Sequence, residues 1–250
     1  MKQRWRFLGF QMAEPALALA VDDAIAEAVS MGESGPTIRF YGWQQPAISI
    51  GRYQEVDRVV DRAECERRGV SVLRRRTGGG AVLHAPAGEI TYSVIAPEGM
   101  LPHDIILSYQ EICGWIISAL RSLNVEAAFR PINDVVVDDR KISGSAQGRR
   151  QGVLLQHGTV LHNIDEEMME AVLRPDLQKL QARGFSHLGE YITSLEQHSP
   201  AGRQELLVAL AEAFLRGKEW YRGELTQDEA ARAEAISYER YLADAWNLQL

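Results

Sequence analysis

The chain of 250 residues carries a formal net charge of −7, with 46% hydrophobic and 24% charged residues, a composition typical of a folded globular protein. Its acidic balance argues against non-specific binding to nucleic acid or membranes, because phosphate-rich surfaces attract basic faces. No stretch approaches the roughly 20 apolar residues that span a bilayer. Two cysteines are too few for a disulfide framework or a cysteine-based zinc site. We therefore expect a cytoplasmic protein with neither nucleic acid nor a membrane as its partner.

The spacing of apolar residues predicts helices and strands that follow one another irregularly. Pro15 begins an Ala-rich helix that runs to about residue 30, since proline fits the first helical turn. A longer helix follows Asp104, with apolar residues on one stripe. Further helices are expected over 57–68, 166–173, 204–215 and 226–242, and strands over 37–41, 47–50, 70–73, 90–96, 125–129, 135–137, 141–143 and 153–161. Tight turns and the lack of regular βαβ alternation predict an α+β fold, with a mixed, largely antiparallel sheet flanked by helices in one domain over 1–250.

A glycine-rich segment from Arg74 to His84 is the most informative part of the sequence. Three arginines end a strand, and Gly78, Gly79 and Gly80 follow one residue later. Glycines let the backbone approach a ligand closely, and neighbouring arginines supply charge for phosphates. The segment is neither a Walker A loop nor a dinucleotide fingerprint. It predicts a phosphate-binding loop, with a glycine-rich hairpin flanked by solvated arginines as the alternative.

A second candidate is Lys141, which lies between an apolar strand and a run of small residues from Ser143 to Ala146. Small side chains leave room for a ligand, and a lysine there could neutralise a phosphate or carboxylate. The alternative is a solvated hairpin lysine.

His157 and His162 form a third candidate. They are five residues apart on a strand, so they face opposite ways and cannot jointly bind a metal. Each could also be an ordinary histidine satisfied by a backbone carbonyl.

Taken together, these segments resemble the lipoate–protein ligase family of the biotin/lipoate ligase superfamily. The motifs that carry the resemblance are Arg74 to His84, Asn133-Asp134 with Arg140 to Ala146, and His157-Gly158-Thr159. Similar residues extend towards both ends of the chain, so the resemblance covers nearly all of it. It implies ATP-dependent activation of lipoate or octanoate to an acyl-adenylate. The acyl group would then pass to a lysine of a lipoyl-domain protein, such as a 2-oxoacid dehydrogenase E2 or a glycine cleavage H-like protein.

The resemblance also implies roles for individual residues, with Lys141 as the catalytic residue. The ATP and adenylate site would comprise Arg75, Gly78, Gly79, Gly80, Ala81, Val82, Leu83, Asn133 and Asp134. The lipoate site would comprise Arg75, His84, Lys141, Ser143, Gly144, Ser145, Ala146, His157 and Gly158. Mg²⁺ is implied for the nucleotide, although no carboxylate can be assigned to it. The family usually has aspartate where this chain has Ala85.

The same superfamily includes octanoyltransferases, which pass the acyl chain through a cysteine thioester without ATP. One such branch resembles this chain at 38–43 and 155–158, but carries its cysteine in a longer insertion before the Lys141 segment. The corresponding stretch here, 127–134, is short and contains no cysteine, so we expect the ATP-dependent ligase. Alternatives are an ATP-independent acyltransferase and a non-catalytic lipoate- or adenylate-binding relative. Many ligases also carry a C-terminal accessory domain. We expect this domain to be absent here, so that a separate accessory protein supplies it or adenylation is weak.

Overall fold

The computed structural model describes residues 4–250, with Lys179 described by its backbone alone. Its centre is an eight-stranded sheet whose first two strand pairs are parallel and whose other pairs are antiparallel. In order across the sheet, the strands are β11 (Trp220–Arg222), β1 (Trp5–Ala13), β2 (Thr37–Trp43), β6 (Glu89–Pro97), β10 (Val153–Leu161), β9 (Arg140–Arg150), β8 (Asp134–Val137) and β7 (Ala128–Arg130). The expected mixed, largely antiparallel sheet is therefore confirmed.

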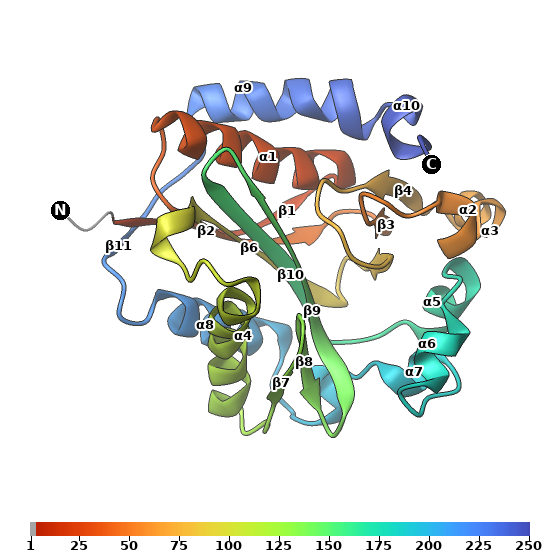
Figure 1. Cartoon of the computed structure of the whole chain (residues 1–250). Helices are drawn as coiled ribbons and strands as arrows, with labels where there is room; N and C mark the ends of the chain where they lie inside the picture. Colours follow the sequence, from red (N-terminus) through yellow and green to blue (C-terminus); the bar gives the residue numbers. More distant parts are fainter. Residues whose placement is uncertain (1–3) are drawn as a thin grey trace.

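Helices cover both faces of this sheet (Figure 1). On one face lie α1 (Pro15–Met31) and α9 (Gln227–Ile236), followed by a π-helical turn, Ser237–Tyr241. On the other face lie α4 (Ile105–Ser122) and α8 (Arg203–Leu215). The apolar stripe of α4 is buried against the sheet, because residues three and four apart share one side of a helix. Over residues 4–250, no helix is long and apolar enough to cross a membrane.

A smaller sheet of three strands lies beside the large one and contributes the glycine-rich loop. Its order is β4 (Ser71–Arg74), β3 (Ala47–Ile50), β5 (Val82–His84), and the loop connects β4 to β5. The remaining helical segments are mostly short: α2 (Val56–Val59), α3 (Arg62–Arg68), α5 (Glu166–Val172), α6 (Leu177–Gln181), α7 (Leu188–Tyr191), α10 (Asp244–Asn247) and the 3₁₀ turns Glu98–Met100 and Leu195–Gln197. Of these, α5 lies against α2 and α3 at one end of the molecule (Figure 1).

Several local predictions were wrong in instructive ways. The single helix expected over 57–68 is interrupted at Val60, whose extended backbone bridges to Leu173. The edge strand β11 and its neighbour β1 were not expected, because each is stabilised by a partner distant in sequence. Strand β9 is far longer than the predicted 141–143, because its polar second half pairs along β10.

Candidate active site

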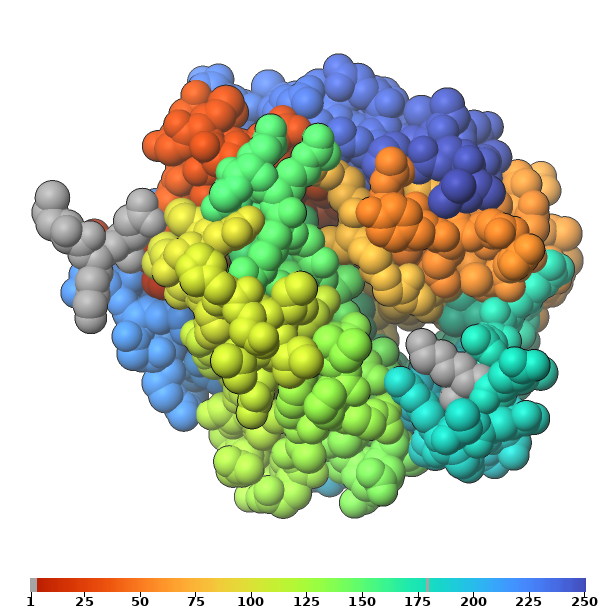
Figure 2. Space-filling model, viewed as in Figure 1, coloured from red at the N-terminus to blue at the C-terminus, as the bar shows by residue number. Residues whose placement is uncertain are grey.

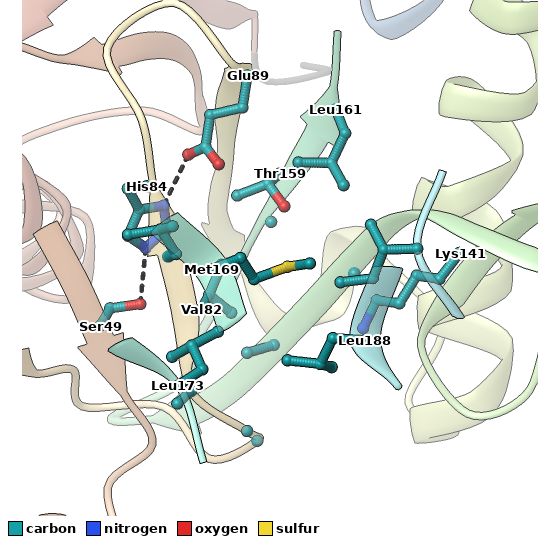
Figure 3. Close-up of a pocket in the computed structure, with 18 of the residues that line it drawn as sticks. Ser49, Val82, His84, Glu89, Lys141, Thr159, Leu161, Met169, Leu173 and Leu188 are labelled. Carbon is teal, nitrogen blue, oxygen red and sulfur yellow. Dashed lines mark hydrogen bonds and ion pairs between the residues drawn. The ribbon is translucent and has the colours of Figure 1, made fainter. Parts of the chain in front are cut away.

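A cavity of about 640 Å³ opens where the two sheets and the α5–α7 segment meet. Its volume suits a small-molecule ligand, since such sites commonly enclose about 300–1,000 Å³. Figure 2 shows the surface hollowed between the green β8–β9 hairpin and the teal α5–α7 segment. Much of the lining is apolar, with Val82, Leu161, Met169, Leu173 and Leu188 facing the space in Figure 3. The cavity therefore suits a molecule with a substantial hydrocarbon portion.

The glycine-rich loop forms one wall of this cavity and is held by Arg75. The buried Arg75 guanidinium donates to the carbonyl oxygens of Ser49, Gly78 and Gly80 at 2.8, 2.6 and 2.8 Å. Gly79 has φ +96°, a conformation that favours glycine. Within the described chain, the backbone N–H groups of 78–81 donate no hydrogen bond. The loop thus presents free donors, while its arginine organises the backbone.

The two arginines beside Arg75 point elsewhere. Arg74 is fully buried and donates to backbone carbonyls that include those of Gln54 and Asn247, so it ties the C-terminal α10 to the small sheet. Arg76 lies 3.3 Å from the buried carboxylate of Asp23. The arginine triplet is therefore mainly structural, and only Arg75 lines the cavity.

Lys141 enters the cavity from the opposite wall, near the start of β9. Asp138 and Asp139 both have positive φ, as a two-residue hairpin turn requires, and they reverse the chain immediately before it. The Lys141 side chain lies over Gly144, where a Cβ would overlap its Nζ, and reaches back to Asp134. Nζ and Asp134 Oδ1 are 2.7 Å apart. Lys141 is thus a positioned cation rather than a freely solvated hairpin lysine.

Asp134 is the centre of a cluster of positive charges. Tyr191 donates to its Oδ2 at 3.0 Å, and Arg130 and Arg183 lie 3.4 and 3.5 Å from the same oxygen. Burial by itself would raise the pKa of this carboxyl, but the charge and hydrogen bond of Lys141, with help from Tyr191 and Arg130, hold that pKa below its ordinary value. Asp134 therefore stays ionised and fixes the ammonium of Lys141.

The β9–β10 pair supplies the floor of the cavity. His157 accompanies Gly158 on β10, and its Nε2 lies 2.7 Å from Thr77 Oγ1. On β9, Ser145 shares a 2.7 Å hydrogen bond with the Tyr92 hydroxyl. A Cβ at Gly158 would approach the carbonyl of Gly144 to 2.5 Å, so glycine there allows the two strands to pair closely. His162, in contrast, lies outside the lining.

Nearly all the residues expected to bind a ligand lie around this one cavity. Its lining includes Arg75, Gly79, Gly80, Ala81, Val82, Leu83, His84, Asn133, Asp134, Lys141, Gly144, Ser145, Ala146, His157 and Gly158. Gly78 and Ser143 do not line it. Gly78 turns its carbonyl to Arg75, and the Ser143 hydroxyl is buried with no partner among the described residues.

Sequence reasoning predicted His84 but missed Trp43, Ser49 and Glu89, which the fold brings into contact with it. His84 stacks on Trp43, with ring centroids 3.9 Å apart, and its two nitrogens bond Ser49 and Glu89. Much of the apolar wall comes from α5 to α7, whose residues carry no motif. The one signal in the sequence is Glu89, a carboxylate at the start of a strand that carries no other charge.

Neither cysteine reaches the cavity. Cys113 lies in the core on α4, where burial raises the pKa of its thiol to about 12. Cys65 lies on α3, and burial raises its pKa to about 11. A thiol with such a pKa is almost entirely protonated at neutral pH, and the thiolate is the reactive form. The site described here therefore contains no activated thiol.

The part of the chain that the structure describes contains no group of three or more His, Cys, Asp or Glu side chains arranged to hold a metal ion. Asp134, the carboxylate nearest to Lys141, already accepts bonds from cations and from Tyr191. The described residues therefore assign no carboxylate to Mg²⁺.

Comparison with known proteins agrees with this arrangement. Residues 14–215 match the family described as the lipoyl protein ligase A/B catalytic domain. The chain belongs to this family. It is 37% identical to octanoyltransferase LipM of Kyrpidia tusciae, over 98% of each chain, and 32% identical to that of Anoxybacillus flavithermus, over 99% of each. The suspected kinship with lipoate ligases and octanoyltransferases is therefore confirmed, and the protein is an enzyme of this group.

The fold is also that of the lipoate ligases. A bipartite lipoate–protein ligase from Thermoplasma acidophilum, studied with its E2 lipoyl domain, superimposes with a TM-score of 0.86 and 25% identity, over 99% of this chain and 97% of the other. Because the LipM relatives are named octanoyltransferases, the ATP-dependent ligation expected from the sequence is not confirmed. ATP-dependent ligation therefore becomes the second reading of the function.

Proposed function

We propose that this protein transfers an octanoyl group from an acyl thioester to a lysine of a lipoyl-domain protein, without ATP. The observation that carries the proposal is the apolar cavity with one fixed ammonium, Lys141, and a wall of free backbone N–H groups. Support comes from the octanoyltransferase relatives that match nearly the whole chain. The acceptors we expect are E2 lipoyl domains or H-like proteins, and we expect the reaction to take place in the cytoplasm.

The chemistry explains why the donor is a thioester. An amine does not form an amide from a free carboxylate without activation, whereas a thioester carbonyl is already activated. In the transfer, the new C–N bond forms, the C–S bond breaks, and the carrier leaves as a thiol. Negative charge develops on the carbonyl oxygen. Fixed donors such as the Lys141 ammonium and the N–H groups of the loop stabilise that charge without reorganisation.

The second candidate is ATP-dependent lipoate ligation through an acyl-adenylate. It is favoured by one observation, namely that neither cysteine reaches the cavity to form a thioester. The free N–H groups of the loop fit nucleotide phosphates. Arg75 is engaged with the loop backbone, however, so its guanidinium already has partners other than a nucleotide. If this second candidate is correct, we expect a separate accessory protein to take part in adenylation.

One experiment separates the two candidates. The purified chain is incubated with a lipoyl-domain acceptor and either octanoyl-coenzyme A without ATP, or octanoate or lipoate with ATP and Mg²⁺. The intact mass of the acceptor is then measured. We expect octanoylation from the thioester alone, and none on an acceptor whose target lysine is replaced. Modification that occurs only with ATP would establish the ligase instead.

A further inference from the structure

Ser49, His84 and Glu89 form a continuous hydrogen-bonded chain at the wall of the cavity. Ser49 Oγ lies 2.8 Å from His84 Nε2, and His84 Nδ1 lies 2.6 Å from Glu89 Oε1. All three residues line the cavity and are almost fully buried. Figure 3 shows them side by side, on three different strands, with Lys141 facing the same space from another wall. A hydroxyl, an imidazole and a carboxylate in this order are the parts of an activated nucleophile.

The orientation of the imidazole is fixed from several directions. An ionised Glu89 can only accept, so it holds the proton of His84 on Nδ1 and leaves Nε2 free to accept from the Ser49 hydroxyl. Thr91 donates to the same Glu89 oxygen at 2.8 Å and accepts from the indole of Trp43 at 2.9 Å. The Trp43 ring also stacks on His84 at an interplanar angle of 15°. These contacts fix the imidazole in an orientation in which Nε2 faces the Ser49 hydroxyl.

Ser49 also has a cation beside it. Arg75 Nη1 lies 2.8 Å from the carbonyl oxygen of Ser49 and 3.3 Å from its Oγ. A guanidinium at this position stabilises negative charge on the serine oxygen. The backbone N–H groups of loop residues 78–81 have no partner in the described chain, and Gly79, Gly80 and Ala81 line the same cavity as Ser49. The nucleophile, its base and a neighbouring cation are thus close together.

A second hydroxyl, imidazole and carboxylate lie close together in the structure, but they are less suited to nucleophilic attack on a bound acyl group. Thr77, His157 and Asp22 are also connected, but His157 Nδ1 is 3.5 Å from Asp22, whose carboxylate already pairs with Arg39 at 2.7 Å. Thr77 does not line the cavity. Only the Ser49 set presents its hydroxyl to the space where an acyl group would bind.

We infer that Ser49 accepts the octanoyl group as an ester during transfer, in the role that a cysteine thiol plays elsewhere in the superfamily. This inference rests on the proposed thioester-dependent function. The Ser49 oxygen attacks the thioester carbonyl, its proton passes to His84 Nε2, the C–S bond breaks, and the thiol leaves with that proton. The acceptor amine then attacks the ester, the C–N bond forms, the ester C–O bond breaks, and Ser49 regains a proton through His84.

The test is to trap the ester. The full chain is mixed with octanoyl-coenzyme A in the absence of acceptor, quenched in acid, and examined by intact mass and peptide mapping. We expect one octanoyl group on the peptide that contains Ser49, and its disappearance when a lipoyl-domain acceptor is added. Transfer to the acceptor is measured in parallel.

Three variants and one matched control sharpen the result. Ser49→Ala should give no adduct and lower transfer at least ~1,000-fold. Ser49→Cys should restore an adduct on the same peptide, now as a thioester that neutral hydroxylamine cleaves. Glu89→Gln should slow acylation without moving the adduct from Ser49, because Glu89 acts only by positioning His84. Ser108→Ala removes another fully buried hydroxyl, outside the cavity lining, and should behave as wild type.

The outcomes separate this inference from the proposed function. Octanoyl transfer with no adduct on Ser49, and undiminished in Ser49→Ala, would overturn the inference and leave the proposed function standing. An adduct on another residue, for example Lys141, would do the same. No transfer from the thioester and no adduct would overturn both. An adduct on Ser49 that moves to the acceptor supports both.

Discussion

Lys141 and Asp134 form an ion pair of 2.7 Å across Gly144, although the hairpin turn separates the two residues in the chain. Asp134 faces Gly144 in the β8–β9 register, and an irregularity between Val135 and Val136 shifts the pairing before Lys141 is reached. The long lysine side chain can therefore fold back over the glycine. The pair fixes the ammonium of Lys141 at a wall of the cavity, which much apolar surface also lines.

Lys141→Ala should abolish transfer while leaving the fold intact. Loss of one preorganised contact to a developing charge typically costs about 2.7–4 kcal/mol, or roughly 100- to 1,000-fold in rate. Asp134 keeps Tyr191, Arg130 and Arg183 as partners, so we expect the unfolding free energy to change by only about 1 kcal/mol. Acceptor octanoylation and thermal melting are measured together.

Lys141→Arg should restore little of the lost transfer, because the planar guanidinium of arginine does not replace the compact ammonium of lysine. Normal transfer by Lys141→Ala would remove Lys141 from the mechanism.

Gly144→Ala should reduce transfer although Lys141 itself is not replaced. The added Cβ would overlap Nζ and Cε of Lys141, so this flexible side chain must leave Asp134, at little cost in stability. Gly158→Ala is the matched comparison. There the new Cβ would meet the backbone of Gly144 and Ser145, which cannot move aside, and we expect a loss of about 1–3 kcal/mol in unfolding free energy. Chemical denaturation and transfer rates of both variants check this. An equally stable and fully active Gly144→Ala would contradict the role of the ion pair.

Replacing both Cys65 and Cys113 with Ser should leave transfer largely intact. Both thiols are buried outside the cavity, and burial raises their pKa values to about 11 and about 12. Burying two hydroxyls in place of thiols costs stability, about 1–3 kcal/mol each, so a double Ala variant serves as the folding control. Iodoacetamide should label neither thiol in the folded protein. A folded double variant without any transfer would restore a cysteine mechanism and remove Ser49 from its proposed role.

The Asp134 ion pair should make stability depend on pH in acid. The pKa of Asp134 is held below its ordinary value of 3.8, so its contribution is complete above that value and disappears as pH falls through the lower folded pKa. Asp134→Asn should therefore destabilise the protein by about 2 kcal/mol near neutral pH, a typical value for bonds to a buried charge. The difference from wild type should shrink as the pH is lowered. Urea unfolding of both proteins across the acid range measures it, and a constant difference would contradict the assignment.

Local patterns in the sequence were sufficient for much of the architecture. Helical spacing after Asp104 and the proline at 15 located α4 and α1, since helices form through contacts close in sequence. The Gly79 loop, Lys141 and His157 were recognised as candidates because their residue types suit phosphate or carbonyl chemistry. Strands β1 and β11 were missed, because their stability comes from pairing with distant strands.

The sequence by itself determined the α+β class, the family, and the residues that the glycine-rich loop, β9 and β10 bring to the cavity. Tertiary structure alone decided how those residues are used. It turned Arg75 onto the loop backbone, paired Lys141 with Asp134, and kept Ser143 out of the lining. It also brought Ser49 and Glu89 to the two nitrogens of His84, from three strands in two sheets. The reason is physical: side-chain partners depend on strand register and on packing between distant segments, which no local sequence pattern specifies.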